Sequence, residues 1–108
     1  MDKESLIAEM NEVGNRYGSE YTRTAKELVG LFDTIESLKN SVKNANKNLV
    51  KATVACYEAM LTKGYMGEEK KKYTSVRQSF IRFSGKLHEA ENLAKIIEKR
   101  LETIKSQE

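Results

Sequence analysis

A heptad pattern of apolar residues constrains this chain more than any other feature of its sequence. Between residues 28 and 59, every position of the form 7n or 7n+3 is apolar. The ten residues are Leu28, Leu31, Ile35, Leu38, Val42, Ala45, Leu49, Ala52, Cys56 and Ala59. This alternating spacing is typical of the stripe along which one α-helix packs against another. We therefore expect a long helix over about residues 19–62.

A second heptad, in a different phase, follows in the C-terminal half. Its ten apolar or aromatic positions are Tyr73, Val76, Phe80, Phe83, Leu87, Ala90, Ala94, Ile97, Leu101 and Ile104. The phase changes across a short segment with Gly64, which suits the end of a helix, and Gly67, which can precede the next one. Helices joined by a short turn pack as antiparallel neighbours, and the chain contains no proline to interrupt them. We expect an all-α, coiled-coil-like helical hairpin with its turn at 63–67 and its second helix at about 68–107.

The N-terminal segment, residues 1–18, is harder to interpret. Asp2 is a candidate N-cap for a short helix with four apolar residues: Leu6, Ile7, Met10 and Val13. Gly14 and Gly18 disfavour a helix interior, but the 7n and 7n+3 register continues across them through Met10, Tyr17 and Tyr21. We expect a short N-terminal helical segment that is continuous with the long helix or bent from it, and the sequence leaves open whether the segment extends that helix or folds back on it. The alternative is a break at the glycines, with Ser19 capping a new helix. The 108 residues fit one helical-hairpin domain, 1–108.

An apolar cluster in the first long helix exceeds what one hairpin needs. Its members are Leu49, Val50, Val54, Tyr57, Met60 and Leu61. A helix that is apolar around most of its circumference is usually buried on more than one side, and two helices alone have no third layer to cover it. The cluster predicts a helical bundle formed by self-association, with a dimer favoured, or docking on another helical protein. The simpler interpretation is a wide core face with scattered exposed apolar side chains.

Basic residues are concentrated around the expected turn. Residues 37–88 carry eleven basic and three acidic side chains, whereas residues 1–36 carry four and eight. Two groups stand out: Lys39, Lys43, Lys47 and Lys51, spaced every four residues, and Lys70, Lys71, Lys72 and Arg77 near the turn. They are candidates for binding an anion or nucleic-acid phosphates. The alternatives are a solvated face and end-to-end assembly, in which the basic turn meets the acidic termini of another copy.

Catalytic chemistry has little support in the sequence. The single histidine, His88, has no ligand partners at metal-binding spacing, and the single cysteine, Cys56, lies on the apolar stripe. Gly14 and Gly18 lack the lysine and serine or threonine of a phosphate-binding loop. We expect no catalytic residue, metal, cofactor or small-molecule substrate, and hence a non-enzymatic adaptor, chaperone or inhibitor.

Three sequence features bear on where in the cell the protein is located. All of them are too short and too charged to span a membrane, so no membrane partner is expected. The N-terminus opens with Met1-Asp2-Lys3-Glu4 and has no basic start or apolar run typical of a signal peptide. A lone cysteine suits a reducing compartment. Together these features predict a cytoplasmic, intracellular protein.

The expected turn carries one short resemblance. Tyr65-Met66-Gly67 resembles the aromatic-x-Gly turn of the WXG100 family and its secretion-partner relatives, which are helical hairpins of about this length. The resemblance implies a small secretion partner as a further functional alternative. This chain has tyrosine in place of tryptophan and no Tyr-x-x-x-Asp/Glu pattern near its C-terminus. No functional residue is therefore carried over from that family.

Overall fold

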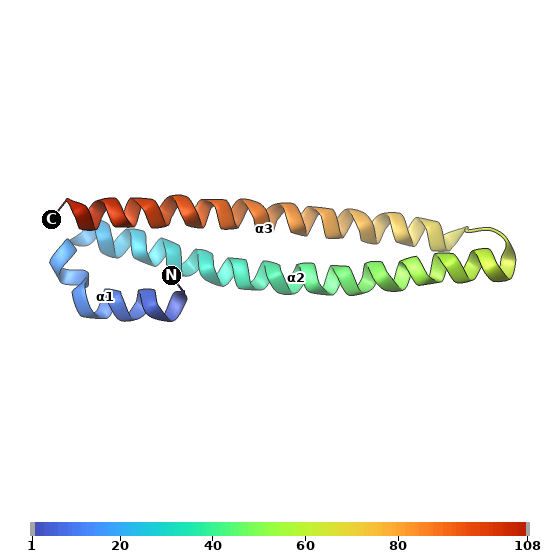
Figure 1. Ribbon diagram of the computed structural model, residues 1–108, viewed down its shortest axis with the longest axis horizontal. Helices are drawn as coiled ribbons and strands as arrows, with labels where there is room; N and C mark the ends of the chain where they lie inside the picture. The colour runs from blue at the N-terminus through green and yellow to red at the C-terminus, as the bar shows by residue number, and fades with distance from the viewer. Residues whose placement is uncertain (1, 108) are drawn as a thin grey trace. The chain divides into compact units, whose positions relative to one another are not determined.

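The computed structural model describes residues 2–107, and these form three helices without a strand. Helix α1 covers Lys3–Tyr17, α2 covers Ser19–Lys63 and α3 covers Glu68–Ser106. Figure 1 shows α2 and α3 running antiparallel, joined by a short turn, with α1 beside the N-terminal part of α2. The expected all-α helical hairpin is confirmed, and α2 and α3 begin and end within one residue of the expected bounds.

Local chemistry explains three of the helix ends. The Asp2 side chain accepts a hydrogen bond from the Ser5 backbone N–H at 2.7 Å, so Asp2 caps α1 as expected. Gly64 follows α2 with a φ of 77°, a left-handed conformation that glycine adopts without strain. The Gly67 carbonyl accepts from the Lys71 N–H at 3.4 Å at the start of α3.

The expected short N-terminal helical segment is present as α1, but the expected continuous or bent connection to the long helix is wrong. Gly18 separates α1 from α2 with a φ of 90° and a ψ of −176°, a conformation essentially restricted to glycine. Ser19 is the first residue of α2, and the carbonyl that accepts the Thr22 N–H belongs to Gly18. Ser19 therefore does not cap the helix, as the alternative had supposed.

Helix α1 folds back along α2 because reversal buries its apolar side. Leu6 is fully buried, while its neighbour Ile7, which lies on the 7n register, is 37% exposed. At the far end of α1, the Lys3 ammonium lies 2.6 Å from a carboxylate oxygen of Asp33. The heptad register across the glycines was misleading because an apolar stripe on α1 can be buried by reversal as well as by continuation.

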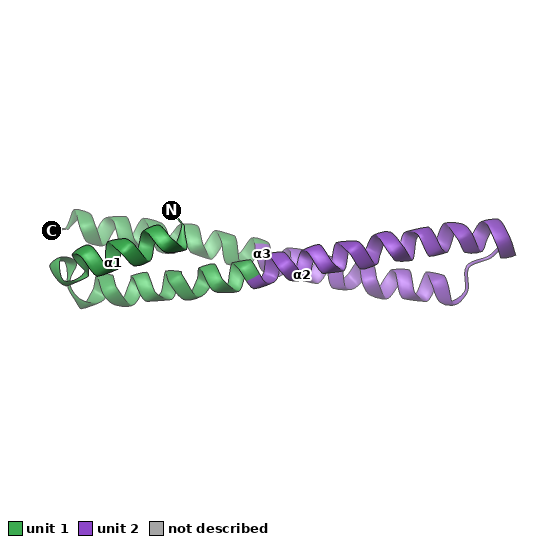
Figure 2. Cartoon of the chain, turned by 90° about the horizontal axis from the view of Figure 1, so that it is seen from below, with its two compact units in different colours: residues 1–36, 88–108 green, residues 37–87 purple. Residues whose placement is uncertain are grey.

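The chain divides into two compact units, coloured separately in Figure 2. Unit 1 comprises Met1–Glu36 and His88–Glu108, and unit 2 comprises Ser37–Leu87. Unit 1 is a three-helix bundle of α1, the start of α2 and the end of α3. Its buried residues are Leu6, Tyr21, Thr24, Ala25, Leu28, Ile35, Ala90, Ala94, Leu101 and Ile104. A third helix thus gives unit 1 a core with large side chains.

A polar network ties α1 to both other helices within unit 1. The Glu9 carboxylate pairs with the Lys105 ammonium and accepts a 2.9 Å hydrogen bond from the Tyr21 hydroxyl. Burial and the Glu9 bond raise the pKa of Tyr21 above its ordinary value. Burial alone would raise the pKa of Glu9, but its bonds from Lys105 and Tyr21 lower it overall. The pair therefore helps α1 to dock while both groups are charged.

Unit 2 contains only two helices, and its core is correspondingly thin. Its buried residues are Ala45, Ala52 and Ala59. The larger residues of the two heptad stripes in unit 2, such as Leu49, Phe80 and Phe83, are only half-buried where α2 meets α3, along what is here termed the hairpin seam. No position of the two predicted stripes, 28–59 and 73–104, is exposed, so both stripes do face the hairpin interface. Unit 2 therefore has the predicted contact between α2 and α3 but no third helix packed on it.

Candidate protein-interaction surface

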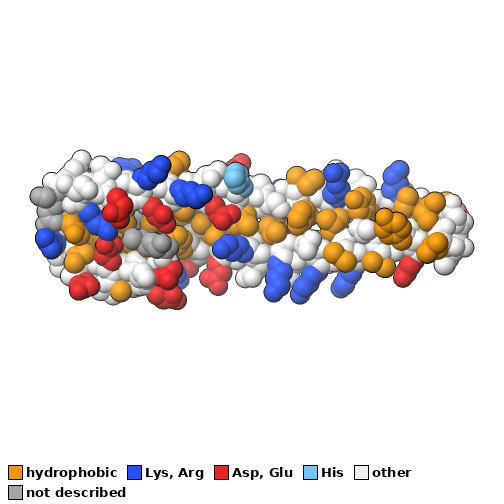
Figure 3. Space-filling view, viewed as in Figure 1, with side chains coloured by type: hydrophobic (Ala, Val, Ile, Leu, Met, Phe, Trp, Pro, Cys, Tyr) orange, Lys and Arg blue, Asp and Glu red, His pale blue; other side chains and the backbone are white. Residues whose placement is uncertain are grey.

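An apolar surface on α2 within unit 2 is left without a covering element. Its residues, here termed the uncovered face, are Val50, Val54, Tyr57, Met60 and Leu61, which are 47% to 86% exposed. They were all predicted as interaction residues. The sixth predicted residue, Leu49, is half-buried because it occupies a 7n position on the hairpin seam. Figure 3 shows hydrophobic side chains reaching the surface toward the turn between α2 and α3.

The heptad register identifies what is missing from this face. In unit 1, α1 contacts α2 at positions 7n, 7n+1 and 7n+5, through Tyr21, Thr22 and Asp33, and the residue at 7n+4 between them is buried. Ala25, at 7n+4, is fully buried, and Asp33, at 7n+5, pairs with α1 through Lys3. At 7n+1, a Cβ added to Gly14 of α1 would lie 3.7 Å from the Thr22 hydroxyl.

The uncovered face occupies register positions 7n+1, 7n+4 and 7n+5, three to five heptads after Thr22, Ala25 and Asp33. Val50 and Tyr57 lie at 7n+1, Met60 at 7n+4, and Val54 and Leu61 at 7n+5. Where unit 1 has α1, unit 2 has solvent. The apolar side chains are therefore placed where a third helix would pack.

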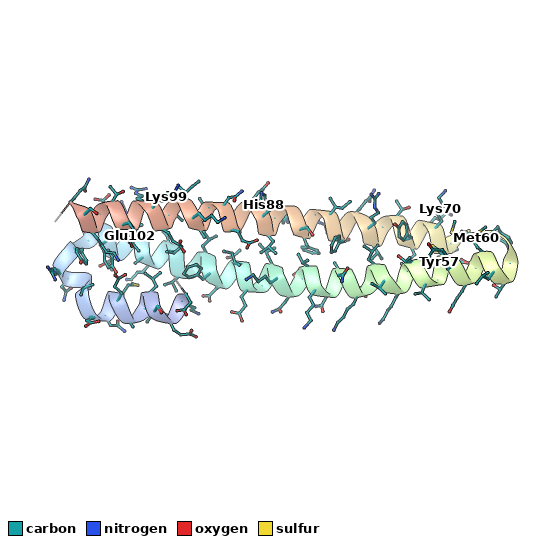
Figure 4. All side chains as sticks on the ribbon, viewed as in Figure 1. Tyr57, Met60, Lys70, His88, Lys99 and Glu102 are labelled. Atoms are coloured by element: carbon teal, nitrogen blue, oxygen red, sulfur yellow. The ribbon has the colours of Figure 1, made fainter. Side chains whose placement is uncertain are left out.

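A groove beside this face extends the surface onto α3. It has a volume of about 330 Å³ and is lined by Thr53, Cys56, Tyr57, Met60, Met66, Lys70 and Tyr73. Figure 4 shows Tyr57, Met60 and Lys70 together near the turn. Sequence reasoning missed the contributions of Thr53, Cys56, Met66 and Tyr73 to this groove. The heptad pattern assigned Tyr73 only to the contact between the two long helices. Met66 lies in the turn, where no heptad pattern predicts the position of a side chain.

Basic side chains flank the uncovered face. Lys39, at 7n+4, Lys43, at 7n+1, and Lys47, at 7n+5, continue the same three register positions toward the N-terminal end of unit 2. Lys51 falls at 7n+2 and lies off this face. All four lysines are exposed, and none forms an ion pair within residues 2–107. One end of the surface is thus apolar and the other basic.

The second basic group, near the turn, is less uniform. Lys71 pairs weakly with Glu68 at 3.4 Å, and Lys72 and Arg77 are exposed. Lys70 lines the groove. Nearby, a hydrogen bond between Lys63 and Glu69 raises the pKa of the lysine and lowers that of the glutamate. The eight predicted basic residues are therefore not brought together into one site.

The division into units coincides with a division of charge. Unit 2 carries eleven basic and three acidic side chains, whereas unit 1 carries eight basic and thirteen acidic ones. The basic excess therefore belongs to the unit with the uncovered face.

Reactive groups elsewhere are few among the described residues. Cys56 donates from Sγ to the Glu69 carbonyl oxygen at 3.4 Å, and exposed His88 interacts through Nε2 with the Asn92 amide at 3.2 Å. No group of three histidine, cysteine, aspartate or glutamate residues in 2–107 is arranged to hold a metal ion. Within the same range, no helix combines the length and apolar character needed to cross a bilayer.

Comparison with known proteins adds no relative. No family model matches the chain, and searches of curated proteins and of solved structures also gave no match. The likeness of the Tyr65-Met66-Gly67 turn to the WXG100 family therefore remains a three-residue resemblance. Function is argued below from the surface of unit 2.

Proposed function

We propose that this chain is a non-enzymatic protein-interaction module whose unit 2 binds a helix along the uncovered face. The observation that carries the proposal is the two-helix state of unit 2, in which only three alanines are buried while five larger apolar side chains of α2 are exposed. Contiguous exposed apolar residues rimmed by polar ones mark interaction sites. The bound helix comes from a second copy or from another helical protein, and the module acts as an adaptor, chaperone or inhibitor.

Photo-crosslinking in the source cell tests this function. We expect a benzophenone amino acid placed at Tyr57 to give adducts of discrete mass, because its ring would sit inside the bound interface. Adding Val54→Asp to the same protein should abolish those adducts, since it puts a charge into an apolar contact. The readout is the set of crosslinked bands and the partner segment identified by mass spectrometry.

Ile96 provides the matched control, because it is exposed to a similar degree, 64% against 70% for Tyr57, but lies in unit 1. The same benzophenone at Ile96 should give no discrete adduct. Identical band patterns from the two positions, or no adduct from Tyr57, would contradict the proposal. A crosslinked band at twice the chain mass would identify a second copy as the partner.

A second candidate function is nucleic-acid binding by unit 2. The specific observation in its favour is that Lys39, Lys43, Lys47 and Lys51 repel one another along one helix without any carboxylate partner among residues 2–107. Phosphates would relieve this repulsion.

Salt titration tests the nucleic-acid candidate. If the four lysines contact phosphates, binding to duplex DNA should weaken steeply with salt. Changing all four to glutamine should then make the slope of log K against log salt less negative by about 3–4, since each phosphate contact contributes about −0.9. Helicity at 222 nm should remain unchanged. An unaltered slope in this variant would remove these lysines from the interface.

A further inference from the structure

Unit 1 has a third helix, α1, and its contacts show how a third helix could pack on unit 2, which has only two. In unit 1, α1 contacts α2 at register positions 7n+1 and 7n+5, beside the buried Ala25 at 7n+4, and its own Leu6 is completely buried. It also places the acidic Glu9 against Lys105 of α3. The third helix is therefore held by the burial of an apolar side chain and by a carboxylate paired with a lysine of α3.

Unit 2 has both features that hold α1 in unit 1, an apolar surface on α2 and a lysine on α3, but no third helix. Its α2 presents the uncovered face at the same register positions. On α3, Lys70 occupies the register position of Lys105, five heptads earlier, and it lines the groove beside Tyr57 and Met60. The lysine is available for a carboxylate, since no ion pair of Lys70 is present within residues 2–107.

Charge determines which kind of helix can complete unit 2. Lys39, Lys43 and Lys47 continue the register positions of the uncovered face, so a helix that covers Leu61 through Lys39 would run alongside all three. That distance is roughly 33 Å along α2 at 1.5 Å per residue. The partner would need apolar residues toward one end and acidic residues toward the other.

A second copy of this chain fits the site poorly. Pairing two copies through their uncovered faces would bring together two units that each carry eleven basic and three acidic side chains. Helix α1 of a second copy is already committed, because its Leu6 and Glu9 are used within its own unit 1.

We infer that the uncovered face of unit 2 binds an acidic amphipathic helix of another protein, in the position that α1 holds in unit 1. This inference rests on the proposed function and specifies its partner. The helix packs its apolar stripe on Val50, Val54, Tyr57 and Leu61. Its carboxylates pair with Lys70 in the groove and with the lysines at the basic end of the face. Helix-in-groove binding of this kind is a common mode of peptide recognition.

Two labelled peptides test the inference on the full-length protein. Both have about 21 residues, enough to form a helix, with the same leucine and isoleucine stripe. One carries glutamate at the flanking positions and the other carries lysine. We expect fluorescence anisotropy at physiological ionic strength to show binding of the acidic peptide and at least tenfold weaker binding of the basic one. Equal binding of both peptides, or no binding of the acidic one, would overturn the inference.

Matched variants separate docking from general attraction to a basic protein. Tyr57→Ala should weaken binding of the acidic peptide at least tenfold, while Ile96→Ala, at a similarly exposed position in unit 1, should leave it unchanged. Lys70→Glu should weaken it more than Lys72→Glu, which makes the same charge change at an exposed position that does not line the groove. Equal effects within either pair would show non-specific attraction and contradict the inference.

The test also distinguishes failure of the inference from failure of the proposed function. Discrete adducts at Tyr57 together with no preference for the acidic peptide would remove the acidic helix and leave the interaction module. Loss of both results would remove both. A light-scattering mass of a dimer that Tyr57→Ala returns to a monomer would show that a second copy occupies the face, which would also overturn the inference.

Discussion

Replacing Gly18 with alanine is expected to release α1 from unit 1 while the chain stays helical. At Gly18 the backbone has a φ of 90°, where a Cβ costs about 1–3 kcal/mol. In a continuous helix the same replacement gains up to about 1 kcal/mol over glycine. The substitution therefore shifts the balance toward a straight α1–α2 helix by roughly 2–4 kcal/mol, which is comparable to the burial of Leu6.

Two measurements together identify this change. Amide hydrogen exchange of residues 6–13 should become much faster because α1 is no longer packed on α2. Helicity at 222 nm should stay the same or rise, because the turn residue has joined a helix. A variant that lost helicity in parallel with protection would simply be unfolding, and a variant with protected α1 would show that the turn tolerates a side chain.

Gly14 is the control for this substitution, since it lies four residues away in α1. A Cβ added to Gly14 would meet the Thr22 Oγ1 at 3.7 Å, an ordinary contact, and its φ is not positive. Gly14→Ala should therefore keep α1 docked and stabilise it by up to about 1 kcal/mol. Opposite responses of the two glycines would locate the break of the first helix at Gly18 alone.

The two long helices could be predicted from sequence because their apolar period is set by their contact with each other. Positions such as Leu28, Ala59 and Leu101 repeat at heptad spacing whatever covers the rest of the helix. The turn was equally accessible, since Gly64 has a positive φ that few other residues adopt and Gly67 directly precedes α3.

The reversal of α1 could not be predicted from the same signal. The spacing of Met10, Tyr17 and Tyr21 is compatible with a stripe that continues and with one that folds back. The deciding contacts join residues far apart in the chain, such as Glu9 with Lys105. A heptad contains no information about such pairs, so a single sequence left both alternatives open.

The candidate surface was predicted in part. The surplus of apolar residues within 49–61 correctly indicated side chains that the hairpin does not bury, with Leu49 as the exception. The sequence could not show that these positions match the ones α1 covers in unit 1, because that comparison requires α1 to be placed first. The role of Lys70 in the groove also depends on the turn geometry.

The two units should differ strongly in local stability in the free chain. Four large side chains of unit 1 are fully buried, Leu6, Tyr21, Leu28 and Leu101, whereas unit 2 buries only alanines. Full burial of one leucine contributes about 1.5–3 kcal/mol, and each 1.4 kcal/mol is about a tenfold change in an equilibrium constant. Two such side chains already correspond to a difference of at least about 100-fold in protection. Unit 2 is therefore expected to open first, beginning at the turn.

Native-state hydrogen exchange of the free chain tests most directly the central claim that unit 2 lacks a third helix. Amides of residues 49–61 and 73–83 should exchange at least about 100-fold faster than those of residues 24–35 and 94–104. Adding the acidic peptide should slow the first two segments and leave the others unchanged. Uniform protection along both long helices of the free chain would contradict the claim, because unit 2 would then be complete without a partner.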